Sequence, residues 1–173
     1  MFSTTEYLAF IPLLIYGMTI AELLTQWKRF FDKDHLYWPY FLTTIIFTEL
    51  AIWNVYSYMY IIKDVQEIGY FNYWIHLLQP LLFLLTVNAL TPGSEDKDIE
   101  VYFKKRISLV FLLMAGFLSC HYIPGFGLAQ SMDIPRIIGI TLCLIVAVLK
   151  KPIWVYPMTI IWVGSLVVRY IQQ

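Results

Sequence analysis

Long apolar runs without any charge alternate with short charged segments along the whole chain. Residues 68–94 and 107–132 contain no Asp, Glu, Lys or Arg. Nearly charge-free runs of 18 or more residues are long enough for a helix to cross the apolar core of a bilayer. The pattern predicts an all-α integral membrane protein, a bundle of six transmembrane helices that forms one domain over residues 1–173. The predicted spans are 7–27, 36–62, 70–91, 107–122, 134–149 and 152–171.

The fifth predicted span, residues 134–149, is short. Its charge-free part, residues 137–149, is shorter than a helix needs to cross a ~30 Å apolar core. We therefore expect Arg136 to extend its side chain to the membrane interface. Only Lys150 and Lys151 separate this span from the sixth, which predicts a very tight turn. Pro152 suits the first turn of the sixth helix, where its missing N–H is not needed.

Composition supports a membrane protein and argues against several kinds of partner. Hydrophobic residues make up 60% of the chain and charged residues 14%, against about 25% charged residues in soluble domains. The net charge is zero, so the basic footprint of a nucleic-acid-binding protein is absent. Cys120 and Cys143 lie in apolar runs without the spacing of metal ligands. We expect the lipid bilayer as a partner, and no nucleic acid, metal or cofactor.

Lys and Arg residues are distributed unevenly among the connections between spans. The first, third and fifth connections hold nine, whereas the termini and the other two connections hold three. Cytoplasmic loops of membrane proteins carry an excess of positive residues. The distribution predicts that loops 28–35, 92–106 and 150–151 are cytoplasmic and that both termini lie outside.

The longest polar segment, residues 92–106, has the charge order of a short helix. Ser94 is placed to cap it, acidic residues follow in the first turn, and basic residues 104–106 stand at its end. This order complements the helix dipole. The segment is interpreted as a solvated cytoplasmic helix leading into the fourth span. The alternative is a surface on which a partner protein docks.

Glu49 is the only charged residue between His35 and Ile62. A carboxylate in the middle of a membrane span costs about 2.5–3.5 kcal/mol on insertion scales, so another group must bind it, neutralise it or use it. In one interpretation Glu49 is protonated and locks helices together by a hydrogen bond. In the other it titrates or binds a cation on a conduction path.

Several polar residues are predicted at neighbouring depths in the membrane. Gln79 is expected near the midplane with Glu49, and His76 about a turn and a half from the outside. Asn88 and Glu22 are both expected near the cytoplasmic end, where Glu22 can also reach the interface. Pro80 should kink the third helix and free the carbonyl group of His76, because proline has no N–H to donate.

Enzyme motifs are absent from the chain. The sequence contains no HExxH zinc motif, no GxSxG nucleophile motif and no glycine-rich phosphate loop. His76 and His121 could in principle ligate a metal or haem, but their predicted depths differ by about a turn or more. No catalytic residue is therefore assigned, and a non-enzymatic role is favoured.

The first hundred residues carry a pattern found elsewhere. Glu22 ends the first span ahead of basic Lys28–Arg29, Trp53 lies within the second span, Gln79–Pro80 lies in the third, and Leu90–Pro92 ends it. This pattern resembles a loose group of small, uncharacterised bacterial membrane proteins. The resemblance implies a six-span protein of the bacterial inner membrane and brings no function.

Two functions from different classes follow from these patterns. The leading one is a small channel or transporter for protons or small cations, with Glu49 at the midplane, Gln79 and His76 beside it, and Glu22 at the cytoplasmic mouth. Six short helices enclose little space, so a pore would form more naturally between the protomers of a homo-oligomer. The alternative is a non-catalytic subunit or scaffold that binds a partner protein through its helices or through residues 92–106.

Overall fold

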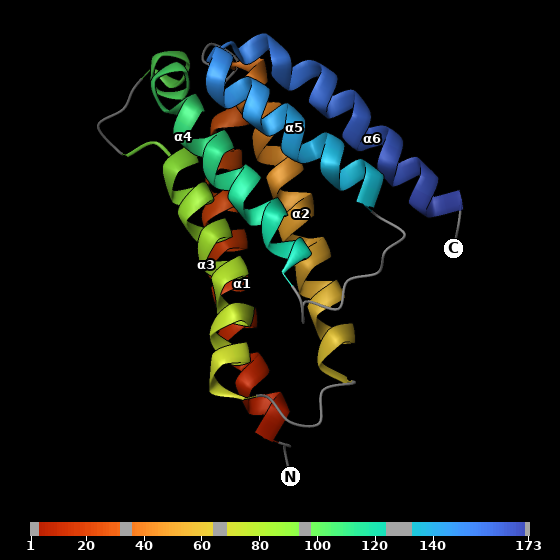
Figure 1. The fold of residues 1–173 in the computed structure, drawn as a ribbon. Coiled ribbons are helices and arrows are strands. Elements are labelled where there is room, and N and C mark those ends of the chain that lie inside the picture. Colours follow the sequence, from red (N-terminus) through yellow and green to blue (C-terminus); the bar gives the residue numbers. More distant parts are fainter. Residues whose placement is uncertain (1–3, 32–35, 64–68, 94–97, 124–132, 172–173) are drawn as a thin grey trace.

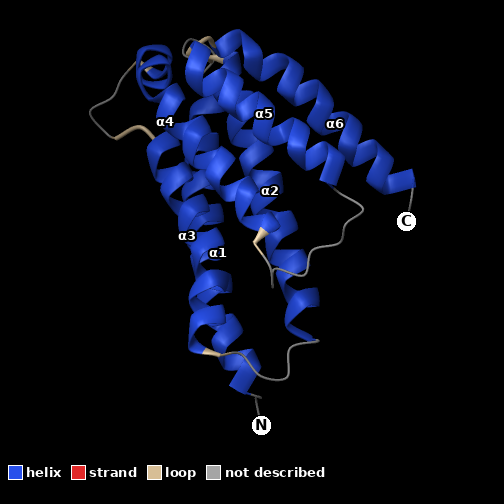
Figure 2. Ribbon diagram, in the orientation of Figure 1, coloured by secondary structure: helices blue, strands red, loops and turns tan. Residues whose placement is uncertain are grey.

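The computed structural model describes residues 4–31, 36–63, 69–93, 98–123 and 133–171. Within these residues every regular element is a helix (Figure 2), so the predicted all-α class is confirmed. The six α-helices are α1 (Thr4–Gln26), α2 (Trp38–Lys63), α3 (Tyr70–Leu90), α4 (Ile99–Ser119), α5 (Asp133–Leu149) and α6 (Val155–Ile171). Three short 3-10 helices extend them: η1 (Trp27–Phe31), η3 (Cys120–Tyr122) and η5 (Pro152–Trp154).

The six helices are arranged as a closed ring. Going around it, α1 packs on α2, α2 on α6, α6 on α5, α5 on α4, α4 on α3, and α3 on α1. Successive helices run in opposite directions (Figure 1). The connections after α1, α3 and α5 therefore lie at one end of the bundle, while the N-terminal end of α1 and the C-terminal end of α2 lie at the other (Figure 1).

The fourth helix begins earlier than the sequence pattern predicts. The expected span started at residue 107, but α4 starts at Ile99, so the polar lead-in and the apolar run form one helix. Its cap is Asp98 rather than Ser94, because the Asp98 side chain accepts a hydrogen bond from the backbone N–H of Val101 at 3.0 Å. Ser94 itself lies outside the described residues. The helix ends at Ser119, and η3 covers the remainder of the predicted span.

The turn between α5 and α6 is as tight as predicted. Lys150 adopts a positive φ of 54°, a left-handed conformation that ends a helix but costs a non-glycine residue energy. Its N–H still donates to the carbonyl group of Val146 at 2.9 Å. Pro152 then stands in the first turn of η5, which leads directly into α6.

Aromatic side chains hold four of the helices together at the centre of the bundle. Phe83 of α3 is fully buried, and its ring centroid lies 6.2 Å from Tyr16 of α1, 6.0 Å from Phe47 of α2 and 4.7 Å from Phe117 of α4. Rings at such separations contribute beyond the area that they bury. This cluster fixes α2 and α4 beside each other, and the candidate site lies next to them.

Among the described residues, two helical segments are long and apolar enough to cross a membrane, Phe10–Phe31 and Tyr73–Leu90. The segments Ile134–Leu149 and Pro152–Val167 are apolar but shorter. Large apolar side chains are exposed on all six helices, among them Phe10, Ile52, Phe71, Leu112, Val148 and Ile160. Soluble monomers rarely expose apolar surface on this scale, so the surface is consistent with a membrane environment.

Candidate functional site

Glu49 of α2 is hydrogen-bonded to the neighbouring helix α6. Its Oε2 atom accepts from the indole Nε1–H of Trp162 at 3.2 Å, and the residue is half-buried. An ionisable group in an apolar segment is costly unless other groups bind it. A donor fixed on a neighbouring helix offsets part of this cost, and the bond is stronger when the acid is ionised.

A second cluster of polar side chains, formed by Asn54, Gln79 and His121, joins α2, α3 and η3. The side-chain amide of Gln79 donates to Oδ1 of Asn54, with a nitrogen-to-oxygen distance of 3.3 Å, and lies 2.6 Å from Nε2 of His121. Asn54 in turn donates to the carbonyl oxygen of Leu50 on its own helix at 2.7 Å. Buried amides need such partners because an unmade hydrogen bond is expensive in an apolar interior.

The donor and acceptor roles of His121 depend on which ring nitrogen carries the proton, and the amide nitrogen of Gln79 lies 3.3 Å from Nδ1 as well as 2.6 Å from Nε2. Nδ1 lies 3.2 Å from the carbonyl oxygen of Leu118, which can only accept a hydrogen bond. Nε2 faces the amide nitrogen of Gln79, which can only donate. The assignment that satisfies both contacts is a neutral imidazole with its proton on Nδ1.

Gln79 lies at the depth of Asn54, which is five residues further along α2 than Glu49. At 1.5 Å per residue this is about 7.5 Å along the helix. The sequence analysis expected Gln79 and Glu49 at similar depth, and the structure corrects this by about a turn and a half. The reason is the register between α2 and α3, which side-chain packing fixes and which span boundaries alone do not.

The other predicted site residues are dispersed. His76 is buried on α3, with its ring centroid 6.4 Å from that of Tyr58. Glu22 is half-buried near the end of α1, and Asn88 is exposed near the end of α3. Pro80 lies inside α3, which continues on both sides of it. Among the predicted residues, Glu49 and Gln79 are the two whose contacts link different helices through the hydrogen bonds described above.

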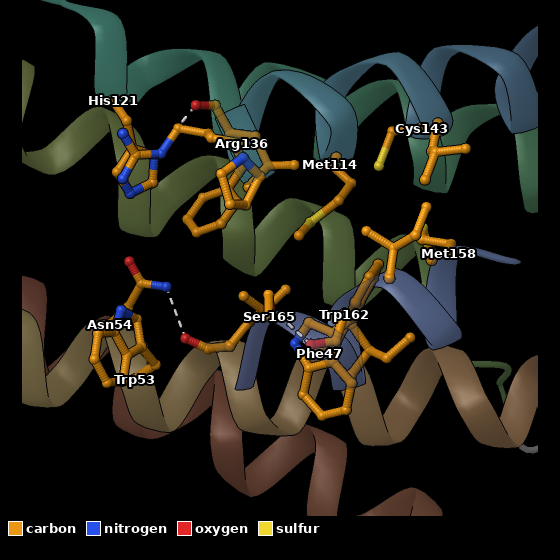
Figure 3. A pocket seen from close by; sticks show the side chains of 18 residues that line it. Phe47, Trp53, Asn54, Met114, His121, Arg136, Cys143, Met158, Trp162 and Ser165 are labelled. Atoms are coloured by element: carbon orange, nitrogen blue, oxygen red, sulfur yellow. Dashed lines mark hydrogen bonds between the residues drawn. The ribbon is translucent and has the colours of Figure 1, made fainter. Parts of the chain in front are cut away.

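A partly enclosed cavity of about 130 Å³ lies between α2, α4, α5 and α6 (Figure 3). Trp162 lines this cavity and also donates to Glu49, so the acid adjoins the cavity through the indole ring. The polar side chains of the lining come from four elements: Asn54 from α2, His121 from η3, Arg136 from α5, and Ser165 from α6. The guanidinium carbon of Arg136 lies 5.9 Å from the ring centroid of Tyr122.

Several of these residues are missing from the sequence-based site. Asn54 could have been identified, because an amide inside an apolar span needs a hydrogen-bond partner as Glu49 does. His121 was considered as a metal ligand with His76, and Arg136 as a residue that reaches the interface. Trp162 carries no such signal, because tryptophans also gather at membrane interfaces for unrelated reasons.

A metal centre is not apparent in the part of the chain that the structure describes. No group of three or more His, Cys, Asp or Glu side chains is placed there to hold an ion. Cys120 and Cys143 are both buried and are not joined to each other. The described site therefore offers proton exchange, hydrogen bonding and one guanidinium charge as its chemistry.

Comparisons of the chain with protein-family models, with curated proteins and with solved structures found no match.

Proposed function

We propose that this chain is a six-span protein of the bacterial inner membrane with both termini outside. The alternating helix directions support this topology (Figure 1), as do the exposed apolar side chains on all six helices. The end of the bundle that holds the connections after α1, α3 and α5 carries most of the described basic residues, namely Lys28, Arg29, Lys104, Lys105, Arg106, Lys150 and Lys151. This is the end expected in the cytoplasm.

We further propose that the protein moves protons across the membrane, with Glu49 as the group that exchanges them. The main support is that Glu49 accepts a hydrogen bond from Trp162, whose indole lines a cavity with polar side chains from four elements. A cavity of about 130 Å³ is large enough for several water molecules, and water that passes the indole of Trp162 to reach Glu49 would supply a path for its proton.

The test is proton flux into proteoliposomes with a pH-sensitive dye inside and an imposed membrane potential. Glu49→Gln keeps the size of the side chain and removes the exchangeable proton, so the flux should fall at least about tenfold, towards that of empty liposomes. Trp162→Phe keeps an aromatic ring and removes the donor to Glu49, so it should change the pH at which flux is half-maximal. Glu100→Gln, an exposed acid at the start of α4, is the matched control and should leave flux unchanged. Unchanged flux in Glu49→Gln would contradict the proposal.

The competing function is a non-transporting subunit that binds a partner through residues 92–106. The described part of this segment forms the first turns of α4 and exposes Glu100, Lys104, Lys105 and Arg106. Glu100 and Lys104 are hydrogen-bonded to each other, and this bond raises the pKa of Lys104. Because these two opposite charges neutralise each other, less net charge remains on this surface to bind a partner. The observation therefore favours a solvated helix over a docking surface. A homo-oligomer is retained as part of the proposal, and its test is the mass of the purified protein in detergent.

A further inference from the structure

The cavity between α2, α4, α5 and α6 has a polar end and an apolar end. On three of its walls a polar residue and an apolar one lie seven positions apart, namely Asn54 and Phe47, His121 and Met114, and Ser165 and Met158. Seven residues are about two helical turns, which keeps both members of a pair on one face of a helix. Because α2, α4 and α6 run in the same direction (Figure 1), the three polar residues lie towards one end.

The polar end offers oxygen atoms that can accept further hydrogen bonds. The hydroxyl group of Ser165 donates to the carbonyl oxygen of Trp162 at 2.7 Å, so its proton is used and its oxygen can still accept. Asn54 donates to the carbonyl oxygen of Leu50 at 2.7 Å. Its Oδ1 atom accepts from Gln79 at 3.3 Å and has a second lone pair. A ligand that matches these oxygens must therefore donate a hydrogen bond.

The lining favours a neutral donor over a charged one. Among the described residues that line the cavity there is no Asp or Glu, so an ammonium group would lose its hydration without gaining a counter-ion. Arg136 also lines the cavity and has contacts of its own within the protein. A neutral ligand needs no ionic partner, so it leaves these contacts in place. A hydroxyl group satisfies both conditions.

The apolar end suits an aromatic ring. Its walls include Phe47 and the flexible, polarisable side chains of Met114 and Met158, and methionine sulfur makes favourable contacts with aromatic rings. The volume of about 130 Å³ is close to that of the apolar cavity of about 150 Å³ that admits benzene. The cavity therefore has room for about one ring. Ligand sites commonly combine apolar walls with a few fixed polar groups in this way.

We propose that this cavity binds a small neutral phenol, with its hydroxyl group donating to Oγ of Ser165 and its ring among Phe47, Met114 and Met158. The phenol supplies the donor that the oxygens of the polar end can accept, and its ring contacts the walls of the apolar end. The site rests on the cavity and on the hydrogen bonds of its lining, and it does not depend on proton transfer at Glu49.

The test is saturable binding of 4-fluorophenol to the purified full chain in nanodiscs of zwitterionic lipid, followed by fluorine NMR. Empty nanodiscs correct for partition into the lipid, and an excess of unlabelled phenol should displace the bound signal. 4-Fluorotoluene, in which a methyl group replaces the hydroxyl group, is the matched ligand without a donor. Pentan-1-ol, which carries its hydroxyl group on a chain, should displace 4-fluorophenol more weakly than phenol does.

Variants identify the hydrogen bond and place the ligand in the cavity. Ser165→Ala removes the acceptor and should weaken binding of 4-fluorophenol about two- to tenfold, as expected for one hydrogen bond, without weakening binding of 4-fluorotoluene. Ser165→Thr keeps a hydroxyl group and should keep this difference. Thr141→Val, which removes an exposed hydroxyl group of α5 that donates to Ile137, should change nothing. Cys143→Leu adds bulk to the buried lining and should weaken binding of both ligands at least about tenfold.

Three results would overturn the proposal in variants whose circular dichroism shows that they are folded. The first is the absence of saturable 4-fluorophenol binding to the unaltered chain. The second is an equal effect of Ser165→Ala on the phenol and on the toluene, which would remove the hydrogen bond. The third is unchanged binding in Cys143→Leu, which would place the ligand elsewhere. Tighter binding of pentan-1-ol than of phenol would refute the assignment of an aromatic ring.

Discussion

Replacing Gln79 with Leu tests whether the amide at the centre of the bundle holds three helical elements together. Gln79 is 3% exposed and contacts Asn54 of α2 and His121 of η3. The substitution removes both contacts and leaves the buried Asn54 and the half-buried His121 without their donor. In membranes, hydrogen bonds between helices contribute about 0.6 kcal/mol on average and up to about 1.7 kcal/mol. For two bonds, the expected loss in free energy of unfolding is about 1–3 kcal/mol.

The assay is reversible unfolding of the purified protein in mixed micelles, followed by circular dichroism. Thr86→Val on the same helix is the matched control, because the buried Thr86 hydroxyl donates to Leu82 of its own helix. Its loss should cost less than about 0.5 kcal/mol. A double-mutant cycle of Gln79→Leu with Asn54→Leu should give a coupling energy of about 0.6–1.7 kcal/mol. A coupling near zero, or equal stability of Gln79→Leu and Thr86→Val, would refute the assigned network.

Two further substitutions test the packing and the helix boundaries. Phe83→Ala removes on the order of 100 Å³ from a fully packed site, and at about 24 cal/mol per Å³ of cavity this costs about 2–3 kcal/mol in free energy of unfolding. Leu85→Ala, at an exposed position of α3, should cost little in the same micelle assay. Equal costs of the two substitutions would contradict the position of Phe83 in the core. Asp98→Ala removes the cap of α4 and should cost about 1 kcal/mol, measured as faster hydrogen exchange at the first amides of the helix; unchanged exchange would argue that α4 begins elsewhere.

The helices could be predicted from the sequence because they follow from the charge-free runs. Each of the six predicted spans corresponds to a helix of the structure, although α4 starts eight residues earlier than residue 107. That error arose because the sequence analysis placed the boundary where the charges end, whereas helical hydrogen bonds continue through Glu100 and Lys104. Charge marks the edge of an apolar environment and does not by itself end a helix.

The neighbours of each helix could not be predicted in the same way. The ring order places α6 between α2 and α5, so Trp162 reaches Glu49 across 113 residues of chain. In helices that are apolar nearly all round, the sequence does not distinguish the face towards lipid from the face towards the core. For the same reason the sequence analysis did not group Asn54, His121 and Arg136, although the structure brings them to one cavity.

Trp162 contacts both the cavity and Glu49, and this couples occupancy of the cavity to protonation of Glu49. One indole ring forms part of the cavity wall and donates its N–H to Glu49. An occupant that displaces this ring changes the hydrogen bond, and with it the affinity of Glu49 for a proton. Coupling between two binding equilibria is reciprocal, so protonation of Glu49 then changes the affinity of the cavity for that occupant by the same factor. Occupancy of the cavity and protonation of Glu49 would in that case be coupled, and a titration of either one would report on the other.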